Sequence, residues 1–128
     1  MKVNVLVDSS LWIEYFSNGP KTNKIAKIIQ NANKGAYKTP SIILFEVYKK
    51  IKKGLNEQAA NEAIAQIVDL TEVIGLNERI AVHAAEISIG TGLAMADAII
   101  MATAELANAE LKTMDKHFKG LKGVEVVQ

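Results

Sequence analysis

The chain has 128 residues, of which 49% are hydrophobic and 5% aromatic, and its net charge is +1. This length and composition fit one domain spanning residues 1–128, with a core built mostly from Ile, Leu, Val and Ala. The absence of cysteine excludes disulfides and thiolate metal sites. The N-terminal apolar run is too short for a signal peptide or a membrane span, so we expect a cytoplasmic protein with no membrane partner.

The charges are distributed unevenly along the chain. Residues 21–53 contain nine lysines and one acid, whereas residues 54–110 contain nine acids and one arginine. Two interpretations stay open at this point. The charges can belong to solvated helix faces of opposite sign, or to a basic strip for phosphates beside an acidic pocket.

The N-terminal segment predicts a buried strand that leads directly into a helix. Residues 2–7 form a short, continuous, β-branched run, which is typical of a buried parallel strand. Asp8 follows, and Ser9 or Ser10 can cap a helix over residues 11–16. This helix is apolar nearly all round, so part of it needs cover from a neighbouring helix or a partner chain.

The rest of the chain alternates helical and extended patterns. Asn56 and Asn77 each stand where a helix N-cap is expected. The alternation of helices with short strands favours a central parallel sheet of about five strands, covered on both faces as a three-layer α/β/α sandwich. We expect the further helices over 22–32, 41–53, 57–69, 78–89 and 94–107, and the further strands over 37–39, 71–74, 111–114 and 124–127.

Four acids stand at strand ends or helix starts. Asp8 and Asp115 directly follow predicted strands, while Glu46 and Asp97 lie near the beginnings of helices. Because the carboxyl ends of parallel strands meet at one edge of a sheet, we expect these four side chains in one pocket. Asp97 can simply complement a helix dipole. However, its neighbours are small and apolar, so it needs a cation or a hydrogen-bond partner to stay ionised.

A divalent cation resolves the repulsion among four carboxylates. Mg²⁺ and Mn²⁺ prefer oxygen ligands, and the absence of cysteine together with only two histidines argues against zinc. Such an ion lowers the pKa of a bound water, and two ions about 4 Å apart stabilise both the attacking and the leaving oxygens of a phosphodiester. The pattern therefore predicts phosphodiester hydrolysis.

The residues that carry this chemistry also resemble a known protein family. The resemblance covers essentially the whole chain and points to the PIN-domain ribonucleases, in particular the VapC-type toxins of toxin–antitoxin pairs. It implies an endoribonuclease that needs Mg²⁺ or Mn²⁺, acts on an RNA substrate, is inhibited by a cognate antitoxin protein and forms a homodimer. The segments that carry it are residues 7–13, Glu46 in the helix after Pro40-Ser41, residues 92–104 and residues 111–118.

The resemblance also implies roles for individual residues. Asp8 and Asp97 correspond to the main metal ligands, and Glu46 completes the metal site or acts as the base. Asp115 holds a second ion or orients a metal-bound water. The hydroxyl residues of the family map onto Ser9 and Thr113, which position a carboxylate or a phosphate.

Several other residues have weaker claims to a role. The lysines after Glu46 span more than one helix face, so not all of them can point at the site. They can bind RNA phosphates or simply cap a helix end. We interpret His83 and His117 as structural and Trp12 as a core or interface residue. The candidates for RNA binding are Lys49, Lys50, Lys53 and Lys116.

Alternative functions fit the sequence less well. A phosphoacceptor receiver domain needs an acid after a mid-chain strand, but Ile74-Gly75-Leu76 offers none. A haloacid-dehalogenase-type phosphatase needs a second aspartate in the position of Ser10. The alternative from a different class is a non-catalytic module that binds RNA or protein on the same fold, and metal binding distinguishes it from a nuclease.

Overall fold

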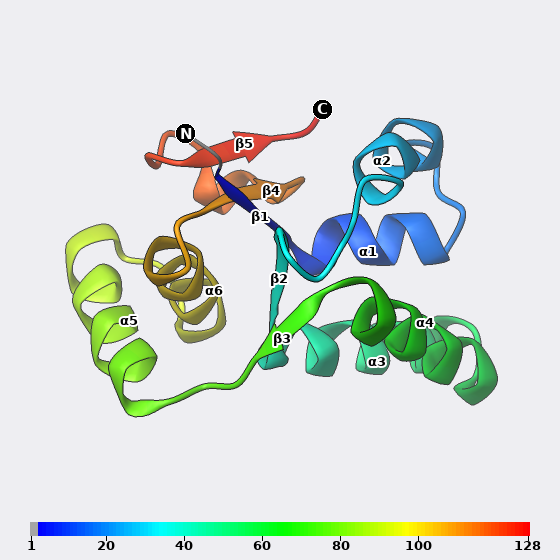
Figure 1. Ribbon diagram of the computed structural model, residues 1–128, viewed down its shortest axis with the longest axis horizontal. Coiled ribbons are helices and arrows are strands. Elements are labelled where there is room, and N and C mark those ends of the chain that lie inside the picture. Colours follow the sequence, from blue (N-terminus) through cyan, green and yellow to red (C-terminus); the bar gives the residue numbers. More distant parts are fainter. Residues whose placement is uncertain (1–2) are drawn as a thin grey trace.

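The computed structural model describes residues 3–128 and contains a five-stranded parallel sheet (Figure 1). The strand order is β3-β2-β1-β4-β5, and every pair of neighbours is parallel. Residue 2 of the predicted first strand lies outside the described residues. The strands are β1 (Asn4–Val7), β2 (Tyr37–Pro40), β3 (Glu72–Ile74), β4 (Ala109–Thr113) and β5 (Val124–Val126).

Helices cover both faces of the sheet and complete the three-layer α/β/α sandwich predicted from the sequence (Figure 1). The first four helices lie on one side, and α5 and α6 lie on the other. A short 3-10 turn, η1 (Lys116–Phe118), follows β4. The helices are α1 (Ser9–Phe16), α2 (Thr22–Ile29), α3 (Ser41–Gly54), α4 (Glu57–Leu70), α5 (Glu78–Thr91) and α6 (Met95–Leu106).

The start of α1 differs from the prediction. Asp8, rather than Ser9 or Ser10, occupies the N-cap position, and no side chain caps the helix. The Asp8 carbonyl accepts hydrogen bonds from the backbone N–H groups of Leu11 and Trp12, at 3.1 and 3.3 Å. The prediction of a serine cap was wrong because the helix begins at Ser9 itself, which places both serines inside its first turn.

Two helix ends also differ from the expected positions. Helix α2 ends at Ile29, three residues before the predicted end at residue 32. Helix α5 continues through Gly90 and ends at Thr91, and Gly92 then adopts a left-handed conformation with φ of 79°. Gly90 keeps a helical conformation, and the helix ends where Gly92 adopts the left-handed conformation that glycine favours.

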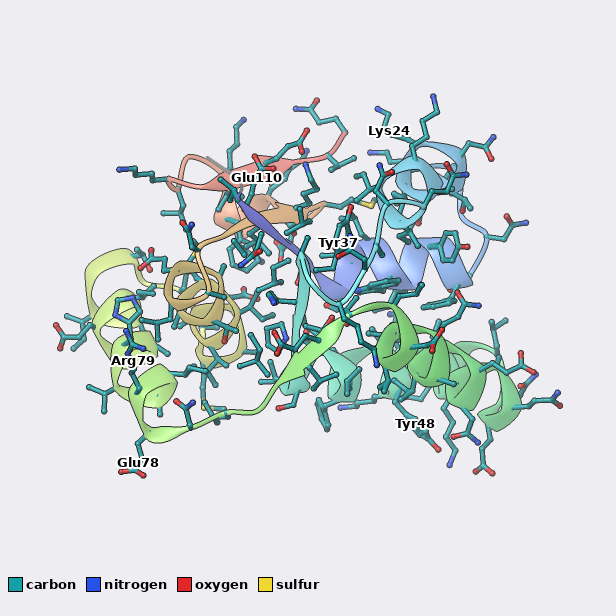
Figure 2. All side chains as sticks on the ribbon, in the orientation of Figure 1. Lys24, Tyr37, Tyr48, Glu78, Arg79 and Glu110 are labelled. Atoms are coloured by element: carbon teal, nitrogen blue, oxygen red, sulfur yellow. The ribbon has the colours of Figure 1, made fainter. Side chains whose placement is uncertain are left out.

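The core is mainly aliphatic, as predicted, and Trp12 is fully buried in it (Figure 2 draws the side chains on the ribbon). Leu11 and Trp12 are the buried residues of α1, and neighbouring helices α2 and α3 pack against this helix. The neighbouring helices therefore supply the cover that its apolar surface needs. Helix α6 is buried along most of its length, from Ala98 to Ala104.

Helices α5 and α6 pack against one another on one face of the sheet (Figure 1). Within residues 3–128, no single helix is long and apolar enough to cross a membrane. Helices α5 and α6 reach that length and composition only as a pair, bent by 114° where they meet. The apolar character of α6 is explained by its place in the core.

The predicted caps at Asn56 and Asn77 are confirmed. The Asn56 side chain accepts a hydrogen bond from the Ala59 N–H at 2.8 Å, and Asn77 does the same for Ile80 at 2.9 Å. Each bond satisfies one of the N–H groups left free at a helix start.

We expect Asn56→Ala to lower the free energy of unfolding by about 1 kcal/mol, because the Ala59 N–H loses its acceptor. Urea denaturation measures the change. Asn61→Ala is the matched control, since Asn61 is exposed inside the same helix and the same atoms are removed. Equal effects of the two substitutions would contradict a capping role for Asn56.

Candidate active site

The carboxyl ends of β1 and β4 form the edge at which the predicted acids gather. These strands are neighbours, with Val7 beside Lys112, and the Asp8 N–H donates to the Lys112 carbonyl at 2.9 Å. Asp115 follows two residues after β4. The parallel pairing therefore brings together two acids that are more than a hundred residues apart in the sequence.

Two hydroxyl groups hold the carboxylate of Asp8 in place. Thr113 Oγ1 donates to Asp8 Oδ2 at 2.7 Å, and Ser10 Oγ donates to the same oxygen at 3.0 Å. Each hydroxyl also accepts a backbone N–H, at 2.9 Å in both cases: Thr113 from Asp115, and Ser10 from Met114. Because the backbone fixes both donors, the orientation of the Asp8 carboxylate is fixed as well.

The environment of Asp8 disfavours its negative charge despite these two hydrogen bonds. The residue is only 3% exposed. Burial raises the pKa of the Asp8 carboxyl above its usual value, and the charge of Asp115 raises it further, while the hydroxyls of Thr113 and Ser10 act in the opposite direction. A cation at this position would stabilise the ionised form.

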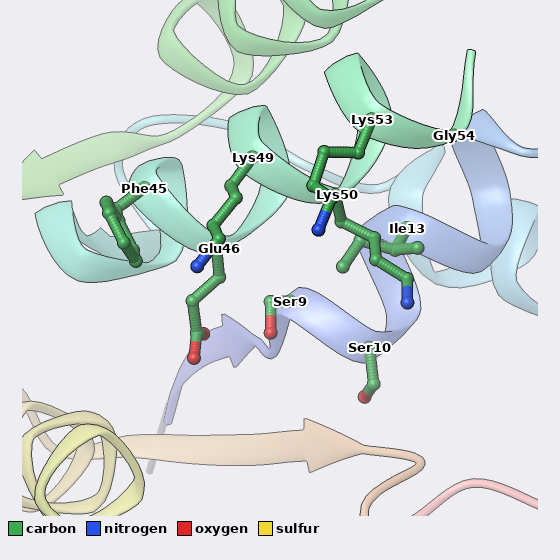
Figure 3. A pocket seen from close by; sticks show the side chains of 9 residues that line it. All are labelled: Ser9, Ser10, Ile13, Phe45, Glu46, Lys49, Lys50, Lys53 and Gly54. Carbon is green, nitrogen blue, oxygen red and sulfur yellow. The ribbon is translucent and has the colours of Figure 1, made fainter.

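Glu46 reaches the same edge from α3. Figure 3 shows its side chain pointing from α3 toward the junction of β1 and α1. Its Oε1 atom is buried, and within residues 3–128 no hydrogen-bond partner reaches it. Burial raises the pKa of Glu46 most, the nearby Ser9 hydroxyl lowers it, and the charges of the other three acids raise it further. A buried, unpaired carboxylate oxygen needs a ligand from outside the chain.

Asp97 and Asp115 approach one another on the α6 side of the site, together with His117. One ligand atom from each of these three residues lies within 4.8 Å of the others. The His117 Nδ1 atom is 2.8 Å from Asp115 Oδ1. Burial raises the pKa of Asp97, followed by the charges of Asp115 and Asp8, whereas His117 lowers it.

The structure therefore brings all four predicted acids into one electrostatically connected group. The charges of Asp8, Asp97 and Asp115 all act on Glu46, and those of Asp8 and Asp115 act on Asp97. Thr113 contacts the Asp8 carboxylate, which is the positioning contact expected of it.

One residue that contacts the acids was missed at the level of sequence. Ser10 hydrogen-bonds Asp8, whereas Ser9 lies beside the carboxylate of Glu46. His117, which we interpreted as structural, adjoins Asp115 and Asp97. Its position two residues after Asp115 was the only available signal, and it did not show which way the imidazole points.

Three of the candidate lysines line a cleft that opens beside the acids (Figure 3). The cleft has a volume of about 700 Å³ and is lined by Glu46 and Ser9 along with Lys49, Lys50 and Lys53. Lys52 lies elsewhere and pairs with Glu57 at 3.1 Å. The expectation that these lysines span more than one helix face is confirmed. Lys116 lies in η1, directly after Asp115.

The donor set fits a hard divalent cation. Asp97, Asp115 and the exposed imidazole of His117 form a group whose ligand atoms can meet one ion, and Asp8 and Glu46 lie near enough for their charges to interact with the acids of this group. The chain has no cysteine. This set is dominated by oxygen, as Mg²⁺ and Mn²⁺ prefer, and it includes an unpaired buried oxygen on Glu46. Burial, together with the charges of neighbouring acids, raises the pKa of Asp8, Glu46 and Asp97, so a bound cation would stabilise their ionised forms.

Comparison with known proteins places the chain in a family. The PIN domain model matches residues 5–124, so the chain belongs to the PIN domain family. No match was found among curated protein sequences.

Solved structures share the fold over nearly the whole chain. A toxin–antitoxin complex from Klebsiella pneumoniae is 26% identical with a TM-score of 0.79, covering 95% of this chain and 96% of that one. The sarcin-ricin loop cleaving toxin VapC20 of Mycobacterium tuberculosis is 14% identical, with a TM-score of 0.80 and coverage of 97% and 98%. DNA-bound VapBC from Salmonella typhimurium is 17% identical, with a TM-score of 0.76 and the same coverage of 97% and 98%.

Removing one charge from the acid group should stabilise the metal-free protein. We expect Asp97→Asn to raise the melting temperature in EDTA. The raised pKa of Asp97 means that the folded state binds its proton more tightly than the unfolded state. The wild type therefore loses stability as the pH rises from about 4 through this raised pKa. Asp97→Asn has no carboxyl at this position, so it does not undergo this loss.

Thermal unfolding in EDTA between pH 4 and 8 measures this difference. Glu86→Gln on the exposed surface of α5 is the matched control for loss of one negative charge. If Asp97→Asn proved no more stable than this control at pH 7, the repulsion inferred for the acid group would be wrong.

Proposed function

We propose that this PIN-domain protein is a metal-dependent endoribonuclease and the toxin of a VapC-type toxin–antitoxin pair. The observation that carries the proposal is the buried, unpaired oxygen of Glu46 beside three other carboxylates. Family membership supports a nuclease. The similarity to a toxin–antitoxin complex and to an RNA-cleaving VapC toxin supports the toxin assignment.

The metal would be held by Asp8, Asp97 and Asp115, with Glu46 completing the site. A bound Mg²⁺ or Mn²⁺ supplies an activated water and positive charge for the phosphate oxygens. Asp8 is fixed by Thr113 and Ser10, so it offers a ligand that needs little reorganisation.

Glu46 would orient the attacking water. Its free Oε1 could accept a proton from that water as the new bond to phosphorus forms, while the leaving oxygen takes a proton from solvent as its own bond to phosphorus breaks. Ser9 lines the same cleft and can donate to a phosphate oxygen.

The RNA backbone would approach along α3. Lys49, Lys50 and Lys53 line the cleft beside Glu46, and each can neutralise a phosphate. Lys116 lies in η1, directly after Asp115, and could contact the RNA there. Three of the nine lysines of residues 21–53 therefore line the cleft. Of the acids of residues 54–110, only Asp97 belongs to the acid group.

The toxin assignment includes protein partners. We propose a cognate antitoxin that covers the active site, and a homodimer. Large apolar side chains support partner binding, because Val82, Ile89 and Met95 are 67%, 82% and 76% exposed on α5 and α6. The protein would act in the cytoplasm, where RNA substrates are available, as a single domain of residues 1–128.

The alternative is a non-catalytic module that binds RNA or protein on the same fold. Calorimetric titration with Mn²⁺ distinguishes the two, because a binding module need not take up an ion at the acids, whereas the nuclease requires one.

Cleavage should require both the metal and Asp8. We expect the wild type to cleave RNA in Mn²⁺ or Mg²⁺ and to be inactive in EDTA. Asp8→Asn should be inactive under both conditions, because the buried metal ligand loses its charge. Gel analysis of labelled total RNA measures cleavage.

Asp69→Asn on the exposed end of α4 controls for contaminating nuclease and for handling. Cleavage by Asp8→Asn at the wild-type rate would show that the activity does not come from this site.

Thr113 should contribute to metal binding only through its hydroxyl group. We expect Thr113→Val to weaken Mn²⁺ binding about 10- to 100-fold, because Asp8 loses a fixed donor. Thr113→Ser keeps the hydroxyl and should stay close to wild type. Titration calorimetry of both variants tests this, and equal Mn²⁺ affinities would contradict the positioning role.

A further inference from the structure

Phe45 is an exposed aromatic residue at the edge of the proposed active site. It precedes Glu46 on α3 and is 63% exposed, although the chain has only three phenylalanines. Figure 3 shows it beside Glu46, on the stretch of α3 that carries the three lysines of the cleft. The Phe45 ring is not buried in the core, so packing within this chain does not explain the presence of an aromatic residue at this position.

The surroundings of Phe45 are cationic. The Lys49 ammonium lies over the ring, 5.6 Å from its centroid. Lys50 and Lys53 line the same cleft, one helical turn apart from each other. Contacts between a cation and an exposed ring are weak, so Lys49 can leave the ring for a phosphate while the ring takes another planar partner.

An exposed ring flanked by lysines fits single-stranded nucleic acid. Proteins that bind unpaired strands combine a positively charged groove for the backbone with aromatic side chains on which bases stack. Phe45 also lines an apolar hollow with Leu44, Tyr48 and Ile64, which a protein partner could use. The lysines in line with the acid group favour a phosphate backbone as the ligand of the cleft itself.

We propose that Phe45 stacks on an unpaired base of the RNA next to the scissile phosphate, while Lys50 and Lys53 bind the adjoining phosphates. This inference rests on the proposed ribonuclease function and adds a binding subsite to it. Stacking needs a base with a free face, so the subsite selects unpaired nucleotides over a duplex. Because every base has such a face, the subsite tolerates different sequences.

RNA binding without cleavage tests the subsite. The probe is a fluorescein-labelled single-stranded RNA of about 15 nucleotides and mixed sequence, bound in EDTA and followed by fluorescence anisotropy. We expect Phe45→Leu to weaken binding about 5- to 100-fold and Phe45→Trp to keep wild-type affinity. Leucine keeps the apolar surface and removes only the aromatic ring, so it separates stacking from general hydrophobic contact.

The salt dependence of binding separates the ring from the lysines. Lys53→Gln should reduce the slope of log K against log salt concentration by about 0.7, the value for one phosphate contact on a single strand. Phe45→Leu should leave this slope unchanged, because no charge is lost. Lys27→Gln, an exposed lysine on α2, is the matched control and should change neither affinity nor slope.

The result that overturns the proposal is wild-type RNA affinity in Phe45→Leu. Unchanged RNA affinity in Phe45→Ala as well would show that the side chain makes no contact with the RNA at all. Metal-dependent cleavage by the wild type is measured in parallel. If the wild type cleaves RNA while the Phe45 variants bind normally, only the subsite fails. If the wild type does not cleave, the proposed function fails.

Discussion

The crowding of negative charge at one sheet edge is the constraint on which this site depends. The parallel pairing of β1 with β4 places Asp8 and Asp115 at the same edge, and α3 and α6 bring Glu46 and Asp97 to it. Burial and the charges of neighbouring acids raise the pKa of Asp8, Glu46 and Asp97. The fold holds this unfavourable arrangement because the surrounding core fixes the strands and helices that carry the acids.

The hydroxyl pair at Asp8 shows how the fold limits that cost. Ser10 and Thr113 both donate to one oxygen of Asp8, and the backbone after β4 fixes both hydroxyls through its N–H groups. The carboxylate is thus oriented before any ion binds. Glu46 has no such support for its buried oxygen, so its partner has to come from a cation or a water. The Asp8 carboxylate is thus held by two hydroxyl groups, whereas the buried oxygen of Glu46 stays available for a ligand.

Helix α3 links chemistry to substrate recognition. It points Glu46 into the acid group and holds Phe45, Lys50 and Lys53 along the cleft beside it. The chain therefore needs no separate binding domain for the RNA that we propose as its substrate. Small changes on this helix would alter which nucleotides bind without touching the metal ligands, because Phe45 and the lysines lie outside the acid group.

The sequence by itself determined the alternation of strands and helices, and with it the sheet edge at which Asp8 and Asp115 meet. Local pattern and helix caps are properties of neighbouring residues, and a parallel topology fixes where strands end. Only the tertiary structure decided that Ser10 and not Ser9 holds Asp8, that His117 joins the acids, and that Lys52 turns away from the cleft. These choices depend on the rotation of each helix or turn about its own axis, which is set by packing against distant segments and leaves no local signal.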